Sequence, residues 1–241
     1  QGAYGRYYQQ PPFLFVTVFP ENRDLRPLRA DHYIAGVRYQ VDQGTRVSLE
    51  VYRKNYDDYP VARDYPQLSF ANIGDTFNVR QILFPLVSAG VGHATGVELY
   101  AEHRGGGRWY GQANLALSRS RHAGLDGVLR PGSFDYPVVV NATGGLRLTS
   151  KWELAGRVAY LSGRPYTPFN EAVSQAQRRG VFDLARVNGV RAPAYFRLDL
   201  RVDRTFTVGG RPLLVFLGVQ NVTNRRNFTQ AVWNRAINAV D

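Results

Sequence analysis

Few side chains in this sequence are spaced for catalysis or for binding a metal ion. No serine is paired with an evident base, and the absence of cysteine removes thiolate ligands and thiol nucleophiles. The histidines show no close metal-ligand spacing; they are His32, His93, His103 and His122. The one catalytic arrangement left open is a small barrel hydrolase or protease in which loop acids assemble with His93; these acids are Asp57, Asp58 and Asp64. We therefore assign no catalytic residue, no metal site and no cofactor.

Charged side chains are instead placed at every second position of extended segments. Residues 196–203 read FRLDLRVD, in which apolar and charged residues alternate strictly. Successive side chains of a strand point to opposite faces, whereas a helix would scatter these residues around its circumference. The segment is therefore predicted to be a strand with one face in an apolar environment and the other facing water or opposite charges.

The composition indicates a folded protein. The chain has 241 residues, of which 44% are hydrophobic, and its formal net charge is +11. No stretch approaches the roughly 18 consecutive apolar residues of a membrane helix, which excludes a helical membrane protein. The arginines are spread along the chain and not gathered on one predicted face, so nucleic acid is not an expected partner.

The alternating segments come in pairs, which predicts an antiparallel sheet. Short polar turns join the two members of each pair, near residues 42–44, 105–107, 149–151 and 208–210. Long connections rich in Pro, Gly, Arg and Asp join one pair to the next, near residues 9–29, 56–94, 120–135 and 164–194. All short turns would then lie at one end and all long loops at the other, as in a transmembrane antiparallel up-and-down β-barrel of the outer membrane. Strands of about ten residues are long enough to cross a bilayer when tilted.

Aromatic residues favour the same fold. Tyr39, Trp109, Trp152 and Phe206 lie beside the short turns, and Tyr136, Tyr160 and Phe196 lie towards the long loops. Two aromatic girdles are typical of outer-membrane barrels, although the same rings could pack the core of a soluble β-sandwich. Two features stay open. Arg204 falls on the apolar face of its strand, so its side chain would have to snorkel to the membrane boundary or a bulge would have to change its facing. Residues 213–219 are apolar on both faces, so the alternation does not assign their facing.

Nearly the whole chain resembles the carboxyl-terminal part of the barrel of TonB-dependent outer-membrane receptors. Six short motifs carry the resemblance through their order and spacing: GVEL at 96–99, WYG at 109–111, FDYP at 134–137, SGRPYTP at 162–168, YFRLDLR at 195–201 and NVTNRRN at 221–227.

The resemblance implies a 22-stranded barrel with a plug domain inside. Such a receptor imports a scarce nutrient of the metal-chelate, vitamin or oligosaccharide class across the outer membrane, with energy from the TonB–ExbB–ExbD complex. This sequence accounts for about nine strands, so we interpret residues 1–241 as a partial barrel domain without the plug domain and the final strand. A passive porin or a small barrel hydrolase is the alternative. The expected partners are a small-molecule substrate, outer-membrane lipid and lipopolysaccharide.

The resemblance also suggests roles for individual residues. Charges on the lumen face would hold the plug and hydrate the translocation path, or would form only a solvated wall; these are Arg38, Glu50, Glu98, Arg147, Arg157, Arg197, Asp199, Arg201 and Asp203. Residues of one long loop would meet an anionic substrate, or lipopolysaccharide phosphates, or no ligand; these are Arg164, Tyr166, Arg178, Arg179, Arg186 and Arg191.

Overall fold

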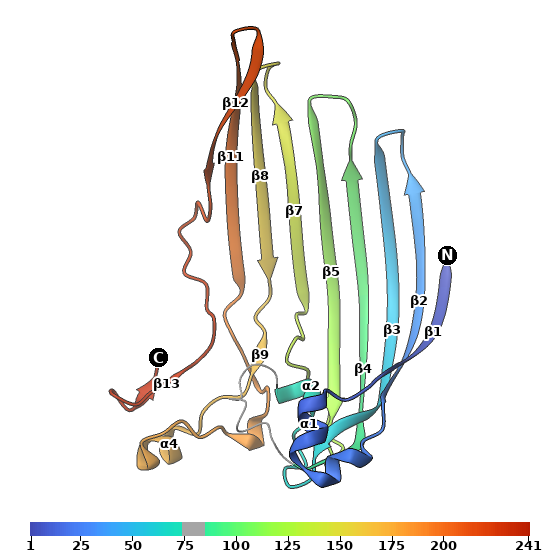
Figure 1. Ribbon diagram of the computed structural model, residues 1–241, viewed down its shortest axis with the longest axis vertical. Helices are drawn as coiled ribbons and strands as arrows, with labels where there is room; N and C mark the ends of the chain where they lie inside the picture. The colour runs from blue at the N-terminus through green and yellow to red at the C-terminus, as the bar shows by residue number, and fades with distance from the viewer. Residues whose placement is uncertain (74–84) are drawn as a thin grey trace.

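One large antiparallel sheet dominates the computed structural model, which describes residues 1–73 and 85–241 (Figure 1). Within these residues the long strands follow one another across the sheet in chain order. They are β1 (Gly2–Gln9), β2 (Leu28–Gln40), β3 (Thr45–Ala62), β4 (Leu86–His103), β5 (Trp109–Ala123), β7 (Val138–Arg147), β8 (Trp152–Leu161), β11 (Tyr195–Val208) and β12 (Arg211–Val219). A two-residue strand, β6 (Arg130–Pro131), pairs with β5. The predicted up-and-down antiparallel fold is confirmed.

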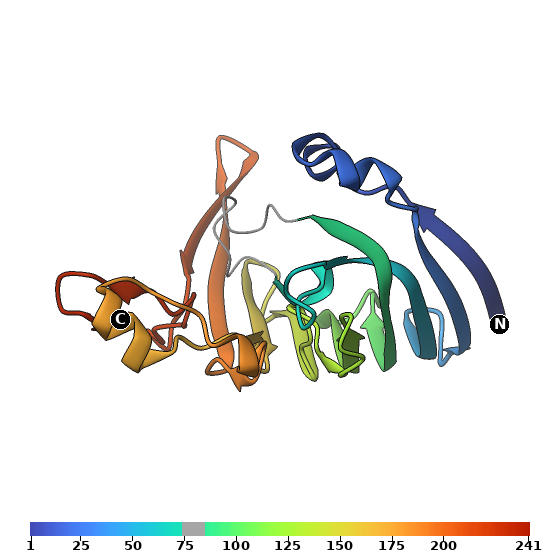
Figure 2. The same cartoon turned by 90° about the horizontal axis from the view of Figure 1, so that it is seen from below.

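The sheet is curved like part of a barrel wall. Seen along the strands, it forms an open arc from β1 to β12, with a concave and a convex side (Figure 2). Every neighbouring pair along this arc is antiparallel. The right-handed twist of strands favours such coiling of a large sheet.

The short turns all lie at one end of the strands (Figure 1). In the turn between β2 and β3, the Asp42 carboxylate accepts hydrogen bonds from the backbone N–H groups of Gly44 and Thr45, at 2.7 and 2.8 Å. The turn between β11 and β12 uses Gly209 and Gly210 at φ of 57° and 77°, where a side chain would be strained. Local turn chemistry therefore fixes which strands become neighbours.

The opposite end carries the long connections and their small elements. These are α1 (Phe13–Val18), η1 (Pro20–Asp24), α2 (Phe70–Ile73), β9 (Pro165–Tyr166), α4 (Glu171–Gln177), η3 (Leu184–Arg186) and β10 (Val190–Arg191), followed by β13 (Trp233–Asn234) and β14 (Ala239–Val240). A compact hydrophobic cluster joins two of these loops, with Leu68 and Ile73 from one, Val187 from the other, and Ala62 from the end of β3. The loops therefore hold one another over the rim of the sheet.

Three strands are longer than the sequence pattern indicated. β3 continues to Ala62 and β4 begins at Leu86, although both positions fall in the loop expected at 56–94. β5 likewise continues to Ala123. The strands keep pairing beyond the apolar belt, where neither face contacts hydrocarbon, so the alternation that marks them in the sequence is lost. Part of the expected loop, residues 74–84, lies outside the described residues.

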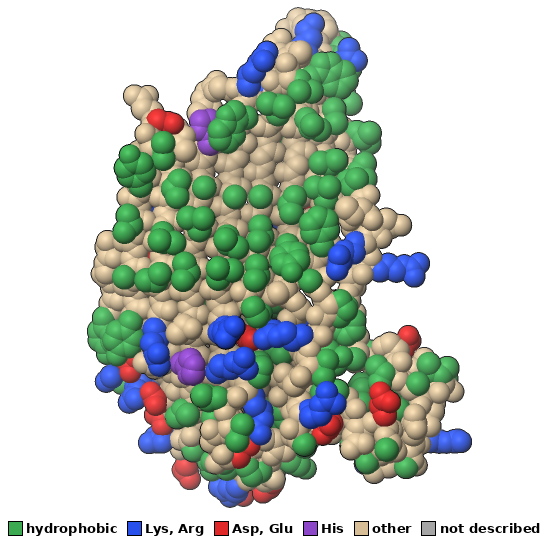
Figure 3. All heavy atoms as spheres, turned by 180° about the vertical axis from the view of Figure 1, so that it is seen from behind, with side chains coloured by type: hydrophobic (Ala, Val, Ile, Leu, Met, Phe, Trp, Pro, Cys, Tyr) green, Lys and Arg blue, Asp and Glu red, His purple; other side chains and the backbone are tan. Residues whose placement is uncertain are grey.

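The convex face carries rows of apolar side chains (Figure 3). The register places the apolar positions of neighbouring strands directly opposite one another, so that each row runs across the sheet. One such row is Val37, Leu49, Leu99, Leu115 and Val140. Val37 is 68% exposed and Leu99 41% exposed, which is the pattern of a surface that contacts lipid.

The helices of the described residues include none that is long and apolar enough to cross a membrane.

The structure settles the two open strand features. Arg204 keeps the register of β11 without a bulge, opposite Trp152 on the convex face. Its guanidinium carbon lies 4.8 Å from the ring centre of Trp152 and 4.4 Å from that of Phe206, so it stacks within the aromatic girdle beside the short turns. In β12, pairing with β11 places Leu213 and Val215 on the convex face.

Candidate functional site

The concave face carries the charges that were predicted to line the lumen. All nine lie on this side, because residues paired across neighbouring strands point to the same face and none of the nine is paired with a residue of the apolar rows. They are Arg38, Glu50, Glu98, Arg147, Arg157, Arg197, Asp199, Arg201 and Asp203. Their contact with a plug and their part in translocation stay predictions.

Strand β11 presents a ladder of opposite charges along this wall. Arg197 donates to Asp199 at 2.7 Å, and Arg201 donates to Asp203 at 2.7 Å. Residues two apart in a strand share a face, so the alternating sequence forms these pairs within one strand. Arg157 of β8 lies directly opposite Asp199 and adds a second cation beside that carboxylate. The ladder is polar but nearly neutral, which suits a hydrated path.

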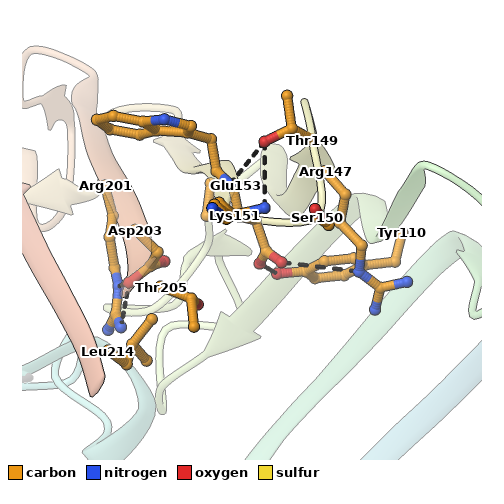
Figure 4. Close-up of a pocket in the computed structure, with 12 residues that line it drawn as sticks. Tyr110, Arg147, Thr149, Ser150, Lys151, Glu153, Arg201, Asp203, Thr205 and Leu214 are labelled. Carbon is orange, nitrogen blue, oxygen red and sulfur yellow. Dashed lines mark hydrogen bonds and ion pairs between the residues drawn. The ribbon is translucent and has the colours of Figure 1, made fainter. Parts of the chain in front are cut away.

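At the short-turn end, the wall is hollowed by a cavity of about 490 Å³ (Figure 4). The Tyr110 hydroxyl donates to Glu153 at 2.5 Å, and Arg147 Nε lies 3.7 Å from the same carboxylate. The Arg147 guanidinium also lies over the Tyr110 ring, 5.6 Å from its centre. Arg201 and Asp203 line the other side of the cavity. This cavity offers fixed donors and acceptors to a polar segment inside the lumen.

The middle of the wall between β3 and β4 is acidic. Glu50 lies directly opposite Glu98. Two like charges in such a pair repel each other and destabilise the sheet locally. Four residues nearer the short turn along β3 the charges are balanced, because Arg46 lies 2.6 Å from Glu102. The Glu50–Glu98 position is therefore complementary to a cationic group inside the lumen.

A second cavity, of about 500 Å³, lies at the loop end of the same wall. Two arginines and three aromatic rings line it; they are Arg157, Arg164, Tyr136, Tyr195 and Phe228. Arg164 donates to the backbone carbonyl of Thr229 at 3.0 Å, which fixes the loop to the segment after β12. Guanidinium groups beside aromatic rings can bind a ligand that carries negative charge and planar groups.

The structure does not gather the six predicted loop residues into one site. Arg164 lines the loop-end cavity, and Tyr166 lies next to it, 6.0 Å from Phe228 between ring centres. Arg191 instead pairs with the buried Asp135, so it fastens this loop to the connection between β6 and β7. The other three are exposed, Arg178 and Arg179 directly after α4 and Arg186 at the end of η3, and none of them lines this cavity.

Two of the three loop acids considered for a hydrolase pair with arginines. Asp57 pairs with Arg29 at 2.7 Å, and Asp58 pairs with Arg26 at 2.6 Å. His93 follows the register of the convex face, opposite Arg121. In the described part of the chain, no group of three or more His, Cys, Asp or Glu side chains is placed to hold a metal ion.

One serine–histidine pair does occur, without the third member of a catalytic triad. Ser120 Oγ lies 3.0 Å from His122 Nε2. The carboxylate of Asp135 accepts from the backbone N–H of Ser120 and pairs with Arg191. The imidazole Nδ1 of buried His122 has no partner among the described residues. A triad needs an acid at that nitrogen, so this arrangement does not match one.

Sequence reasoning missed part of both cavities. Tyr110 shares the parity of the predicted lumen charges, so counting outward from the short turns would have placed it on the wall. Phe228 gave no such signal, because it lies after the last strand and reaches the cavity only through the fold.

Comparisons with known proteins identify the family. A family model described as "TonB dependent receptor-like, beta-barrel" matches residues 1–222. No curated protein matches the chain. Among solved structures, the ferric-catecholate import receptor Fiu of Escherichia coli K12 is 14% identical with a TM-score of 0.65, over 93% of this chain and 28% of Fiu.

Two further structures have the same fold. The ferripyoverdine receptor of Pseudomonas aeruginosa is 14% identical with a TM-score of 0.65, over 93% of this chain and 27% of that receptor. The FrpB iron transporter of Neisseria meningitidis is 18% identical with a TM-score of 0.54, over 84% of this chain and 28% of FrpB. The chain thus spans little more than a quarter of each of these proteins. Since the family model covers nearly the whole chain, this protein belongs to the TonB-dependent receptors, as part of their outer-membrane β-barrel.

Proposed function

We propose that the receptor binds an anionic chelate of a scarce nutrient and imports it actively across the outer membrane. It acts as a transporter and not as an enzyme. The TonB–ExbB–ExbD complex would supply the energy, through parts of the receptor other than this segment of the barrel. The observation that carries the proposal is the loop-end cavity of about 500 Å³.

The lining of this cavity supports an anionic ligand. Arg157 projects from β8 and Arg164 from the loop that follows it, so two guanidinium groups adjoin one cavity. Guanidinium groups bind carboxylate and phenolate oxygens through charge-assisted hydrogen bonds. The rings of Tyr136, Tyr195 and Phe228 add apolar surface for the planar parts of a chelator. The solved structures that share the fold include receptors whose names specify ferric catecholate and ferripyoverdine.

The wall below the cavity supports movement through the lumen. From Arg157 the β11 ladder leads towards the short turns as alternating charges already paired with one another. A paired wall binds a passing anion weakly, because each guanidinium is partly neutralised by its own carboxylate. The ligand would therefore be held at the loop end and released along the ladder.

The test uses the full-length receptor. Binding of a panel of ferric chelates is measured by fluorescence quenching, and uptake of the iron-labelled chelate is measured in cells with and without TonB. We expect the double variant Arg157→Gln/Arg164→Gln to bind an anionic chelate at least about tenfold more weakly, since two charge-assisted contacts are lost.

The matched control is Arg178→Gln/Arg179→Gln, which removes the same charge from exposed positions near α4 and should leave binding unchanged. Equal loss in both double variants would contradict a role for the cavity. Tight binding of a neutral vitamin or oligosaccharide with no effect of either pair would contradict an anionic substrate. Uptake that continues without TonB would indicate a passive pore.

A further inference from the structure

One asparagine–glycine pair occurs in the sequence, and it lies where two long connections meet. Asn188 and Gly189 lie between η3 and β10, in the connection between β8 and β11. The side-chain amide of Asn188 donates to the backbone carbonyl of Pro131 at 2.8 Å, and its backbone N–H donates to Thr167 Oγ1 at 3.1 Å. Asn188 is only 3% exposed. It therefore joins its own loop to β6, in the connection between β5 and β7.

This junction also joins the two sides of the loop-end cavity. Tyr136 lines the cavity from the connection between β5 and β7, and Arg164 lines it from the connection between β8 and β11. Arg191 pairs with Asp135 between the same two connections. Loss of the Asn188 contact would therefore loosen the cavity from both sides.

An asparagine followed by glycine is chemically labile in an exposed chain. The glycine nitrogen attacks Cγ of the asparagine side chain, because glycine has no side chain to hinder the approach. A bond forms between that nitrogen and Cγ, and ammonia leaves, which gives a cyclic imide. Water then adds to either imide carbonyl and opens the ring to aspartate or isoaspartate. The amide is thus exchanged for a carboxylate with no change of oxidation state.

The folded loops block the first step. The backbone N–H of Gly189 donates to the carbonyl of Arg186 at 2.8 Å, so the attacking nitrogen is already engaged. The Asn188 amide, which would have to turn towards that nitrogen, is held by Pro131. Reacting atoms must be about 3–3.5 Å apart and aligned, so both contacts must break first. The rate of deamidation should therefore follow the fraction of molecules in which the loops are open.

We propose that Asn188 is a deamidation site, inert while the two connections are joined, whose modification after opening prevents the loops from closing again. A carboxylate has no proton to donate to the Pro131 carbonyl, so two acceptor oxygens would face each other in a buried site. Isoaspartate also lengthens the backbone at this position. The change is irreversible, so receptors whose loops open often would lose the closed loop-end cavity with age. The inference rests on the contacts between loops and not on the proposed import.

The first test follows deamidation by mass spectrometry in the full-length receptor at mildly alkaline pH, with a free peptide of residues 184–194 as the reference. We expect residue 188 to react at least about tenfold more slowly in the receptor, because closed loops protect it. Arg191→Gln leaves the buried Asp135 without its ion pair and should raise the rate at least about fivefold. The matched control is Arg179→Gln, which removes the same charge from an exposed position of the same loop and should leave the rate unchanged. Equal rates in receptor and peptide, or in the two variants, would overturn the proposal.

The second test measures the consequence of the modification. Asn188→Asp introduces the aspartate product and should speed amide hydrogen exchange in residues 124–137 and 162–194 at least about tenfold. The matched control is Asn170→Asp, the same substitution in the same loop. Asn170 Oδ1 accepts from the backbone N–H of Val173 at 3.2 Å, which a carboxylate does equally well, so exchange should not change. Equal exchange in the two variants would overturn the proposal. If Asn188→Asp failed to fold, the comparison of receptor with peptide would still decide, and neither test depends on chelate binding.

Discussion

Substitution by arginine should destabilise the protein strongly at one residue of β5 and only slightly at the residue next to it. Leu115 lies in an apolar row of the convex face, whereas Asn114 points to the concave wall. Along the strand, Leu115 is about 20 Å from Trp109 at one edge of the belt and about 13 Å from Arg119 at the other, at about 3.3 Å per residue. Leu115→Arg therefore places a guanidinium deep in hydrocarbon. Asn114→Arg places it in the polar lumen.

The expected difference in folding free energy follows from depth. An arginine on the lipid face near the midplane costs about 2–4 kcal/mol, and near the interface about 0–1 kcal/mol. Leu115→Arg should thus lower the folding equilibrium constant by a factor of about 30 to 1,000, and Asn114→Arg should lower it less than about fivefold. Arg204, at the girdle, serves as an internal reference, because Arg204→Leu should change the free energy by less than about 1 kcal/mol.

The assay is guanidinium chloride unfolding of the full-length receptor folded into phospholipid vesicles, followed by tryptophan fluorescence. Each free energy is compared with that of the unaltered receptor under the same conditions. If Asn114→Arg destabilises the protein as much as Leu115→Arg, the assignment of the two faces is refuted. If neither substitution destabilises the protein, the apolar rows of the convex face do not contact hydrocarbon.

Three further predictions concern the two ends of the strands. Tyr110→Phe removes the hydrogen bond to Glu153 and should cost about 1 kcal/mol in the same unfolding assay, since a partly exposed bond to a charged acceptor is lost; no change would mean that the cavity is not held by this contact. The pKa of Asp42 in the turn is lowered, chiefly by the backbone N–H of Gly44 and also by the hydroxyl of Thr45, so the carboxylate stabilises the fold above its unfolded pKa near 4 and this is lost as the pH falls through the lower folded value. Asp42→Asn should therefore be less stable than the unaltered protein at pH 7, and this difference should shrink as the pH falls below 4; a pH-independent gap would contradict this origin. Leu68→Ala should open the loop cluster at a cost of about 2–5 kcal/mol, seen as faster hydrogen exchange in the loops and not in the sheet, because Leu68 is only 1% exposed; unchanged loop exchange would show that the cluster does not hold them.

The face to which each side chain points, and the strands that pair with each other, were predictable from the sequence wherever a strand separates lipid from the lumen. In β11 the apolar parity predicted from the sequence is the convex face of the structure, and in β2 and β3 the predicted lumen residues Arg38 and Glu50 lie on the concave face. A one-residue slip would turn charges such as Arg201 towards lipid, so hydrocarbon on one side enforces the alternation. The short turns then determined which strands are neighbours, because their lengths leave no room for another connection.

Tertiary structure decided what alternation could not encode. In β12 both parities are apolar, and only its register against β11 assigns Leu213 outward and Phe216 inward, where Arg201 lies 4.0 Å from the ring centre. The positions of the loop residues also depended on packing. Arg164 reached a cavity while Arg191 was bound by Asp135, because loops beyond the membrane are shaped by contacts between distant segments and not by a periodic boundary.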